Sequence, residues 1–268
     1  MLSVEDLRYS YGATQVVRGI SFSVSRGEAL GFLGPNGAGK TTTLSCVCGL
    51  RADWRGQMSW DGRPFRPADA AGDRLKLGLV PQEMAIYENL SARENLDFFA
   101  RLSGVAAGER AAAVDAGLEL AGLRDRSGDR VATFSGGMKR RLNLAIGTVH
   151  SPQLLLLDEP TAGVDPQSRA HLFDSLTRLR EQGLTLVYTT HVMEEVERLC
   201  SRVIIMDRGR AVADGAPSAL AEEVGQPGAS LETVFLKLTG RTLRDANDAA
   251  ADVTDPADES PPATGEIA

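Results

Sequence analysis

The sequence predicts an α/β fold, in which a mainly parallel sheet is covered by helices on both faces and a second, α-rich lobe is inserted. Short apolar strands alternate with helical segments along most of the chain, which is typical of parallel sheets. From residue 91 to about residue 125, in contrast, the sequence predicts an α-rich stretch. The 268 residues suit one large α/β domain with a small subdomain and can bury a full core.

The strands are expected from their hydrophobic pattern. Within the first 30 residues, Phe22 and Val24 alternate with serines, the period-two pattern of a half-buried strand. Short apolar runs predict further strands at 28–33, 57–60, 77–80, 154–157, 184–189 and 202–206.

The helices are expected from their capping residues and one-sided apolar faces. Ser91-Ala92-Arg93-Glu94 is a capping-box sequence, which predicts a helix start. Asp165-Pro166 opens another helix with a good cap and a proline at the first position. Further helices are expected at 40–50, after a glycine-rich turn, and near 231–238. The apolar face of the second, which most simply packs on the core, consists of Leu231, Val234, Phe235 and Leu238.

The net charge of -7 is unevenly distributed. Residues 245–268 hold seven acids and no Lys or Arg, and the other 244 residues balance 29 basic against 29 acidic side chains. The core therefore lacks the basic bias of a nucleic-acid binder, and no nucleic-acid partner is expected. Residues 241–268 are rich in Ala, Asp, Pro and Thr, which predicts a disordered acidic tail.

Three cysteines cannot form a disulfide framework and favour reduced thiols in the cytosol. The acidic start of the chain has no apolar segment, so no secretory signal is expected. No run approaches the ~18 apolar residues that a membrane helix needs, so any membrane role is expected to come through a partner.

The clearest motif is a phosphate loop. Gly34-Pro35-Asn36-Gly37-Ala38-Gly39-Lys40-Thr41 matches G-x-x-x-x-G-K-[ST] in full, between a buried strand and a helix. The glycines let backbone N–H groups surround a β-phosphate at the helix N-terminus. Lys40 adds a charge for the β- and γ-phosphates, and the Thr41 hydroxyl can bind Mg²⁺. We count Thr42 with this site.

A second motif follows at residues 154–159, where four leucines precede Asp158 and Glu159. We expect Asp158 to bind the metal through water and Glu159 to act as general base on the attacking water. An apolar strand ending in two acids is common by itself. Downstream of a phosphate loop it becomes a strong indication of nucleotide hydrolysis.

Further residues make the chain resemble the ATP-binding cassette family. Ser135-Gly136-Gly137 before a helical stretch resembles the family's signature motif, and Ala162-Gly163-Val164-Asp165 resembles the loop that crosses between subunits. Gln82 follows a strand and a proline, as the family's glutamine loop does, and His191 follows a strand as the switch histidine does. The resemblance covers roughly residues 1–240.

The resemblance implies roles for these residues. Tyr11 would stack on adenine. Gln82 would sense the γ-phosphate and Mg²⁺, and His191 would hold the γ-phosphate and the attacking water. Ser135, Gly136 and Gly137 would bind the γ-phosphate of the ATP held by the opposite subunit. The expected catalytic residues are thus Lys40, Gln82, Glu159 and His191; the expected metal ligands are Thr41, Gln82 and Asp158.

Two residues depart from the commonest signature. Phe134 replaces the usual Leu and keeps the apolar anchor. Met138 replaces the usual Gln and loses a side-chain amide, which affects the expected affinity and rate.

The implied fold is a phosphate-loop NTPase core with a mainly parallel sheet, an N-terminal antiparallel β subdomain and an inserted α-helical subdomain at about 83–145. The nucleotide-binding domain is expected over 1–240, with a C-terminal helical extension at about 216–240.

Residues 87–96 and 231–240 resemble the daunorubicin-resistance branch, whose single cassettes pair with a separate membrane permease and export drugs, polysaccharides or lipid-like molecules. We therefore expect an ATPase subunit of an exporter, with a role such as antibiotic resistance. It would be peripheral, at the cytoplasmic face of the membrane, and would act through closure of two cassettes, as a homodimer.

Two alternatives remain open. The first is a non-transport cassette that acts on ribosomes or nucleic acid, which would usually carry two cassettes or long basic or coiled-coil insertions. The second is an inactive regulatory cassette, which would lack Glu159 or His191, whereas this chain has both residues.

Overall fold

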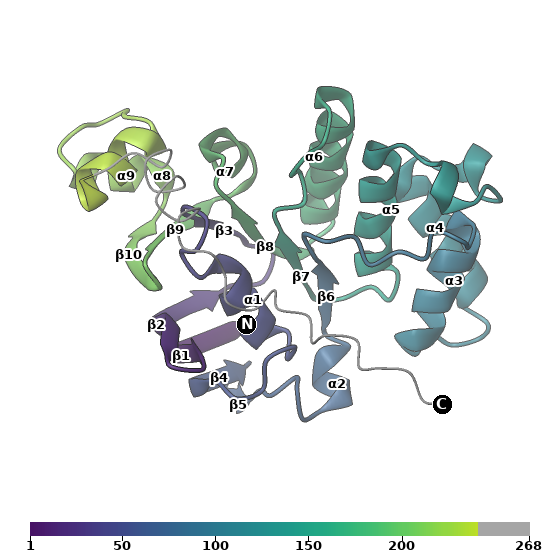
Figure 1. The fold of residues 1–268 in the computed structure, drawn as a ribbon, viewed down its shortest axis with the longest axis horizontal. Coiled ribbons are helices and arrows are strands. Elements are labelled where there is room, and N and C mark those ends of the chain that lie inside the picture. Colours follow the sequence, from purple (N-terminus) through teal and green to yellow (C-terminus); the bar gives the residue numbers. More distant parts are fainter. Residues whose placement is uncertain (241–268) are drawn as a thin grey trace, which may run out of the picture.

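The computed structural model describes residues 1–240, and its fold has two sheets and a group of helices (Figure 1). The predicted α/β class with a mainly parallel sheet and an N-terminal antiparallel sheet is confirmed. The disordered tail predicted at 241–268 lies outside the described residues. None of the helices within residues 1–240 is both long and apolar enough to cross a bilayer.

The N-terminal sheet is antiparallel and has the order β2-β1-β4-β5. Its long first pair places Leu2 opposite Val24 and Tyr11 opposite Thr14. The strands of this sheet are β1 (Leu2–Tyr11), β2 (Thr14–Val24), β4 (Arg55–Trp60) and β5 (Arg63–Pro64).

The main sheet has the order β10-β9-β3-β8-β7-β6, and only β10 runs antiparallel to its neighbour. Its central strands are buried over their whole length, which explains their continuous apolar sequence. Its strands are β3 (Ala29–Leu33), β6 (Leu77–Val80), β7 (Leu154–Asp158), β8 (Thr185–Thr190), β9 (Arg202–Asp207) and β10 (Arg210–Gly215).

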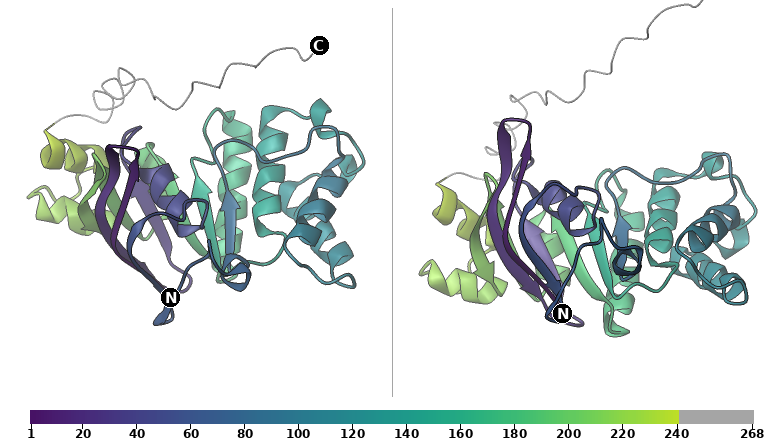
Figure 2. Two further views of the ribbon diagram at one scale, coloured as in Figure 1. Left: turned by 60° about the horizontal axis from the view of Figure 1, so that its bottom comes forward. Right: turned by 90° about the horizontal axis from the view of Figure 1, so that it is seen from below.

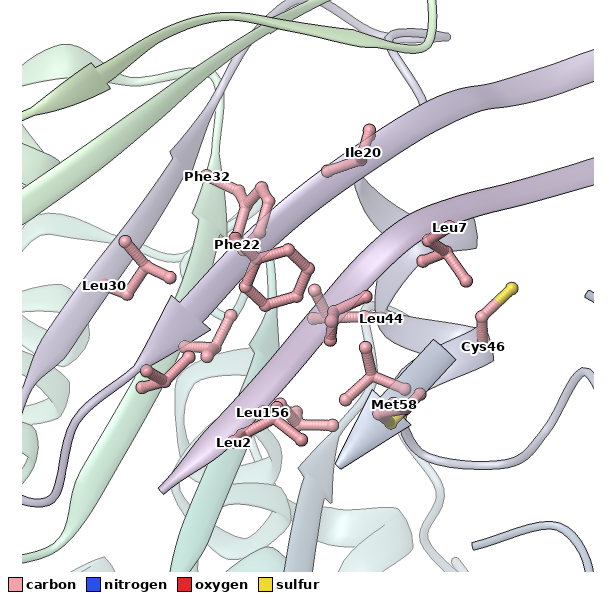
Figure 3. Packing of buried hydrophobic residues seen from close by; sticks show 14 of the residues in the cluster. Leu2, Leu7, Ile20, Phe22, Leu30, Phe32, Leu44, Cys46, Met58 and Leu156 are labelled. Atoms are coloured by element: carbon pink, nitrogen blue, oxygen red, sulfur yellow. The ribbon is translucent and has the colours of Figure 1, made fainter. Parts of the chain in front are cut away.

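Helix α1 (Lys40–Val47) packs into the core between the two sheets. Figure 3 shows Phe22 of β2, Phe32 of β3 and Leu44 of α1 within this core. The Phe22 and Phe32 rings meet edge to face, with centroids 5.0 Å apart. This packing fixes the start of α1 against the end of β3, where the phosphate loop lies.

The other face of the main sheet is covered by helices that follow strand β7 in the chain. Leu231, Val234 and Phe235 are buried there as predicted, whereas Leu238, expected on the same face, is 41% exposed. The covering helices are α6 (Pro166–Glu181), α7 (Met193–Leu199), α8 (Pro217–Glu223) and α9 (Leu231–Thr239).

A helical lobe, here meaning α3, α4 and α5, has a hydrophobic cluster of its own. Figures 1 and 2 place it at the opposite end of the molecule from α8 and α9. The helices are α3 (Ala92–Leu102), α4 (Arg110–Ala121) and α5 (Gly136–Thr148). The short helix α2 (Ala71–Arg74) and two 3-10 turns, Arg124–Arg126 and Val131–Thr133, complete the described helices.

Candidate functional site

The phosphate loop connects β3 to α1, as the sequence predicted. Gly39 occupies the N-cap position of α1 with φ of 97°, a left-handed conformation that favours glycine. The helix start has no side-chain cap, so its N–H groups can face an anion. These features fit a bound phosphate group.

Lys40 is the first residue of α1 and is 4% exposed. Its ammonium donates to the carbonyls of Gly34 (2.8 Å) and Pro35 (3.1 Å) and lies 3.3 Å from Glu159 Oε1. Burial lowers the pKa of Lys40, and the nearby Glu159 carboxylate opposes that shift. The cation is thus held at the centre of the loop by its own chain.

Asp158 ends strand β7, and its Oδ1 accepts two hydrogen bonds. One comes from Thr41 Oγ1 at 3.0 Å and the other from Thr189 Oγ1 at 2.6 Å. Burial raises the pKa of Asp158, and the two hydroxyl donors oppose this rise. Thr189 was not among the predicted site residues. It lies directly opposite Asp158 in the β7–β8 register, which a strand alignment could have indicated.

Glu159 is 7% exposed and its carboxylate lies between two basic side chains. Oε1 is 3.3 Å from Lys40 Nζ, and Oε2 is 3.2 Å from His191 Nδ1. Burial favours a higher pKa for Glu159, but His191 and Lys40 together hold its pKa below the usual value. The carboxylate is therefore ionised near neutral pH.

His191 follows β8, as the sequence predicted. Its Nδ1 is within ion-pair distance of Glu159 but does not meet hydrogen-bond geometry, so the contact is electrostatic. The Glu159 carboxylate raises the pKa of His191, although burial acts against it. The two groups thus stabilise each other's charged forms.

Gln82 follows β6 and lines the same pocket as the phosphate loop. This pocket, which we call the loop pocket, has a volume of about 250 Å³ and includes Lys40, Thr41 and Glu159. His191 lines a neighbouring pocket of about 180 Å³, to which Glu159 also contributes. The structure therefore brings the predicted catalytic residues together around Glu159.

Tyr11 lies at the end of β1, 42% exposed, and does not line the loop pocket. Its ring meets Tyr9 edge to face with centroids 5.0 Å apart, and the Arg51 guanidinium lies over it at 5.0 Å. Val16, on the neighbouring strand, does line the pocket. The hairpin of β1 and β2 therefore carries Tyr11 and also borders the loop pocket through Val16.

Ser135 caps α5, and its Oγ accepts from the Met138 N–H at 3.3 Å. The two glycines that follow differ in their surroundings. A Cβ on Gly137 would lie 1.9 Å from Ser168 Oγ, whereas a Cβ on Gly136 would meet nothing within 4 Å. The close packing of α5 on α6 therefore explains why position 137 needs a glycine, whereas Gly136 faces open space.

The signature residues do not reach the loop pocket of their own chain. Ser135, Gly136 and Gly137 belong to the helical lobe, and none of them lines that pocket. Figure 1 shows α5 and α1 in different parts of the molecule.

Sequence reasoning also missed Glu195, a buried acid on α7 that is 4% exposed. Its carboxylate accepts from Thr161 Oγ1 (2.7 Å), Tyr188 OH (2.9 Å) and Thr190 Oγ1 (2.7 Å). It thereby ties the chain after Glu159 to the residue before His191. Three nearby residues, Glu194, Glu197 and Arg198, are also charged, so the pattern resembles an exposed helix and gives no signal.

A pocket of this kind, at the carboxyl edge of a parallel sheet, defines a phosphate-loop NTPase. The family within this class is also defined, because the family model described as ABC transporter matches residues 17–162. The chain belongs to this family of ATP-binding cassette ATPases, and the resemblance stated from the sequence is confirmed.

Several relatives have names connected with resistance or export. The linearmycin resistance ATP-binding protein LnrL of Bacillus subtilis is 46% identical over 228 residues, which cover 84% of this chain and 72% of that protein. The Nod factor export ATP-binding protein I of Paraburkholderia xenovorans is 45% identical over 225 residues, covering 84% and 74%.

Solved structures of ABC transporter components share the fold. An ATP-binding subunit of an ABC transporter superimposes with a TM-score of 0.80 at 31% identity, covering 89% of this chain and 99% of that one. CbiO1 of Clostridium perfringens, part of the ABC transporter complex cbiONQ, has a TM-score of 0.74 at 27% identity, covering 93% and 98%.

Proposed function

We propose that this chain hydrolyses ATP in a site that it shares with a second cassette, and that hydrolysis drives export through a separate membrane permease. The observation that carries the proposal is the position of Glu159, held between Lys40 and His191 beside the loop pocket. The names of the relatives support the direction of transport. We assign the nucleotide-binding domain to residues 1–240, with the helical subdomain at about 83–145 and a helical extension at about 216–240.

In the proposed reaction a water oxygen attacks the γ-phosphorus of ATP. The bond from the γ-phosphorus to the β–γ bridging oxygen breaks, ADP leaves, and Glu159 accepts the proton of the water. The lowered pKa of Glu159 keeps it in the basic form that this step needs. His191, beside the same carboxylate, is placed to hold the water and the γ-phosphate.

The hydrogen bonds of Lys40 suggest how ATP binding makes Glu159 available as the general base. We expect phosphate oxygens to replace the Gly34 and Pro35 carbonyls as acceptors, because anionic oxygens accept stronger hydrogen bonds. This exchange would weaken the ion pair between Lys40 and Glu159. The Glu159 carboxylate would then be available to the attacking water.

The residues also fit Mg²⁺, which supplies charge neutralisation on the phosphates when bound. Thr41, Asp158 and Gln82 offer hydroxyl, carboxylate and amide oxygens, the hard donors that this ion prefers. Thr41 Oγ1 already donates to Asp158 Oδ1 at 3.0 Å, so these two oxygens are close enough to bind the same ion. No cluster of three or more His, Cys, Asp or Glu able to hold a metal occurs in residues 1–240.

Glu159→Gln tests the assignment of the general base. The amide cannot accept the proton, so turnover should fall by ~10²–10⁴ while ATP still binds. With ATP bound but not hydrolysed, the two cassettes should remain closed, and size-exclusion chromatography should show an ATP-dependent dimer. Near wild-type hydrolysis by this variant would overturn the assignment.

We propose that the permease docks beside the glutamine loop. Tyr87 is 50% exposed and packs edge to face against Phe98 of α3, with centroids 5.0 Å apart. Leu102, one turn after Phe98, is 70% exposed. Such an apolar group is typical of a docking surface. Ile86, in contrast, packs on the hydrophobic cluster of the helical lobe.

Met84, which is half-buried, lies in the same segment three residues before Tyr87, and Tyr87→Ala combined with Met84→Ser tests this surface. The isolated variant should hydrolyse ATP at close to the basal rate, because neither side chain lines the loop pocket. Its ATPase activity should no longer respond to the permease that co-purifies with the wild-type chain. Normal co-purification and normal transport would place the docking surface elsewhere.

A further inference from the structure

Three consecutive cations, Lys139, Arg140 and Arg141, lie in the second turn of α5. Positive side chains near a helix N-terminus oppose the helix dipole, and α5 has no acid in its first turn to compensate. Their presence therefore needs another physical reason. Each of the three makes a specific contact with a different segment of the chain.

Two of these cations hold α5 within its own lobe. Lys139 forms an ion pair with Glu88, in the segment before α3. Arg141 Nη1 donates to the carbonyl of Ala121 at the end of α4, at 2.8 Å. These contacts stabilise the lobe and touch no part of the nucleotide site.

Arg140 differs because its guanidinium reaches outside the lobe in two directions. Nη1 donates to the carbonyl of Gln82, and Nη2 donates to the carbonyl of Ala162 at 3.3 Å. Gln82 lines the loop pocket, and the Ala162 N–H donates to the carbonyl of Glu159 at 3.1 Å. One side chain thus connects the glutamine loop with the segment that follows the proposed base.

A second residue of α5 hydrogen-bonds to the peptide carbonyl just before Gln82. Asn143, which is 1% exposed, donates from Nδ2 to the carbonyl of Pro81 at 3.3 Å. Arg140 and Asn143 are three positions apart and so share one face of α5. Together they bind two successive carbonyls of the glutamine loop, which is a stronger constraint than one contact.

We propose that Arg140 is a positioning residue that couples the loop pocket to the signature motif. Its planar guanidinium hydrogen-bonds both to the glutamine loop and to the chain after Glu159. A displacement of Gln82 therefore moves α5 and the segment around Ala162 as one unit. Ser135 caps the same helix five residues earlier, so its position relative to a partner's ATP depends on this contact. The inference rests on the proposed shared site.

The test uses the full chain with Arg140→Gln and Arg140→Lys. Lysine keeps the charge but cannot bond both carbonyls with one fixed fork. We expect kcat to fall at least about fivefold for both variants, with little change in the KM for ATP. In the Glu159→Gln background, the ATP concentration that gives half-maximal dimer should rise by a similar factor. The melting temperature should stay within a few degrees of the parent protein.

Arg101→Gln is the matched control, because Arg101 lies in the same lobe and, within residues 1–240, its guanidinium bonds only the side chain of Asp97, on its own helix. It should behave as wild type. An unchanged kcat and dimer midpoint in both Arg140 variants would overturn the inference. So would a loss of activity that simply parallels a loss of melting temperature. A Glu159→Gln parent that forms no dimer with ATP would instead contradict the shared site itself.

Discussion

Glu159 has a backbone φ of 43°, in the left-handed region that residues other than glycine rarely occupy. This conformation costs about 1–2 kcal/mol and persists only where the surroundings impose it. Here the Glu159 N–H donates to the carbonyl and to the hydroxyl of Thr189, each at 3.1 Å. These bonds hold the peptide in the conformation that directs the carboxylate between Lys40 and His191, which supports its proposed role.

The two signature glycines allow a matched prediction. Gly137→Ala should lower the free energy of unfolding by about 1–3 kcal/mol, because the new methyl group overlaps Ser168. Gly136→Ala should not destabilise the fold, since its surroundings are open and alanine favours helix by up to about 1 kcal/mol. It should nevertheless reduce ATPase activity, because the methyl group would occupy the space through which a partner's phosphate approaches.

Urea unfolding and steady-state ATPase assays on the two glycine variants separate these effects. A stable Gly136→Ala protein with full activity would show that the open space at Gly136 receives no ligand.

Strands β7 and β8 place the site residues side by side. Their parallel register sets Asp158 opposite Thr189, and the next residue of the β8 strand, Thr190, leads to His191. Helix α7 then places Glu195 in the same region. Three hydroxyl groups donate to the Glu195 carboxylate, and these bonds connect the ends of both strands. The geometry of Glu159 and His191 therefore depends on pairing between elements far apart in sequence.

Glu195→Ala should destabilise the protein through the hydroxyls left without an acceptor. Each buried polar group that loses its partner costs about 1–3 kcal/mol, although Thr161 and Tyr188, 3.5 Å apart, can partly satisfy each other. We expect a loss of at least about 2 kcal/mol in urea unfolding. Glu194→Ala, the exposed neighbour, is the control and should be nearly neutral. Equal stability of the two variants would show that the Glu195 network contributes little.

Local signals predicted many elements but not all of them. The capping box at Ser91 and the Asp165-Pro166 start are both found, because these caps bond within a few residues. The helix expected over 40–50 ends at Val47, where the chain turns through Gly49 with φ of 82°. Strand β10 was missed because it is largely exposed and has no apolar pattern.

The motif residues were recognisable, whereas most of their contacts were not. The phosphate-loop sequence predicts its own local structure, so Lys40 and Thr41 could be assigned directly. The bonds from Arg140 to Gln82 and Ala162 join residues 58 and 22 positions apart. A pattern in one sequence carries no information on such tertiary pairs.

In the whole molecule, the helical lobe carries Ser135 while the sheet core carries the phosphate loop. Neither Ser135 nor Gly136 contacts the loop pocket of its own chain, and both are exposed. A γ-phosphate that needs both motifs must therefore lie between two chains. The proposed function depends on this arrangement.

The most direct test mixes two inactive chains. Lys40→Ala removes the phosphate-binding cation, and Ser135→Arg places a long side chain at the start of α5. In a mixed dimer both changes fall on one composite site, and the other site is intact. We predict that each variant is inactive alone and that mixing recovers a substantial part of the ATPase activity, increasing with protein concentration. No recovery on mixing, with a specific activity of the wild type that does not depend on concentration, would contradict the shared site.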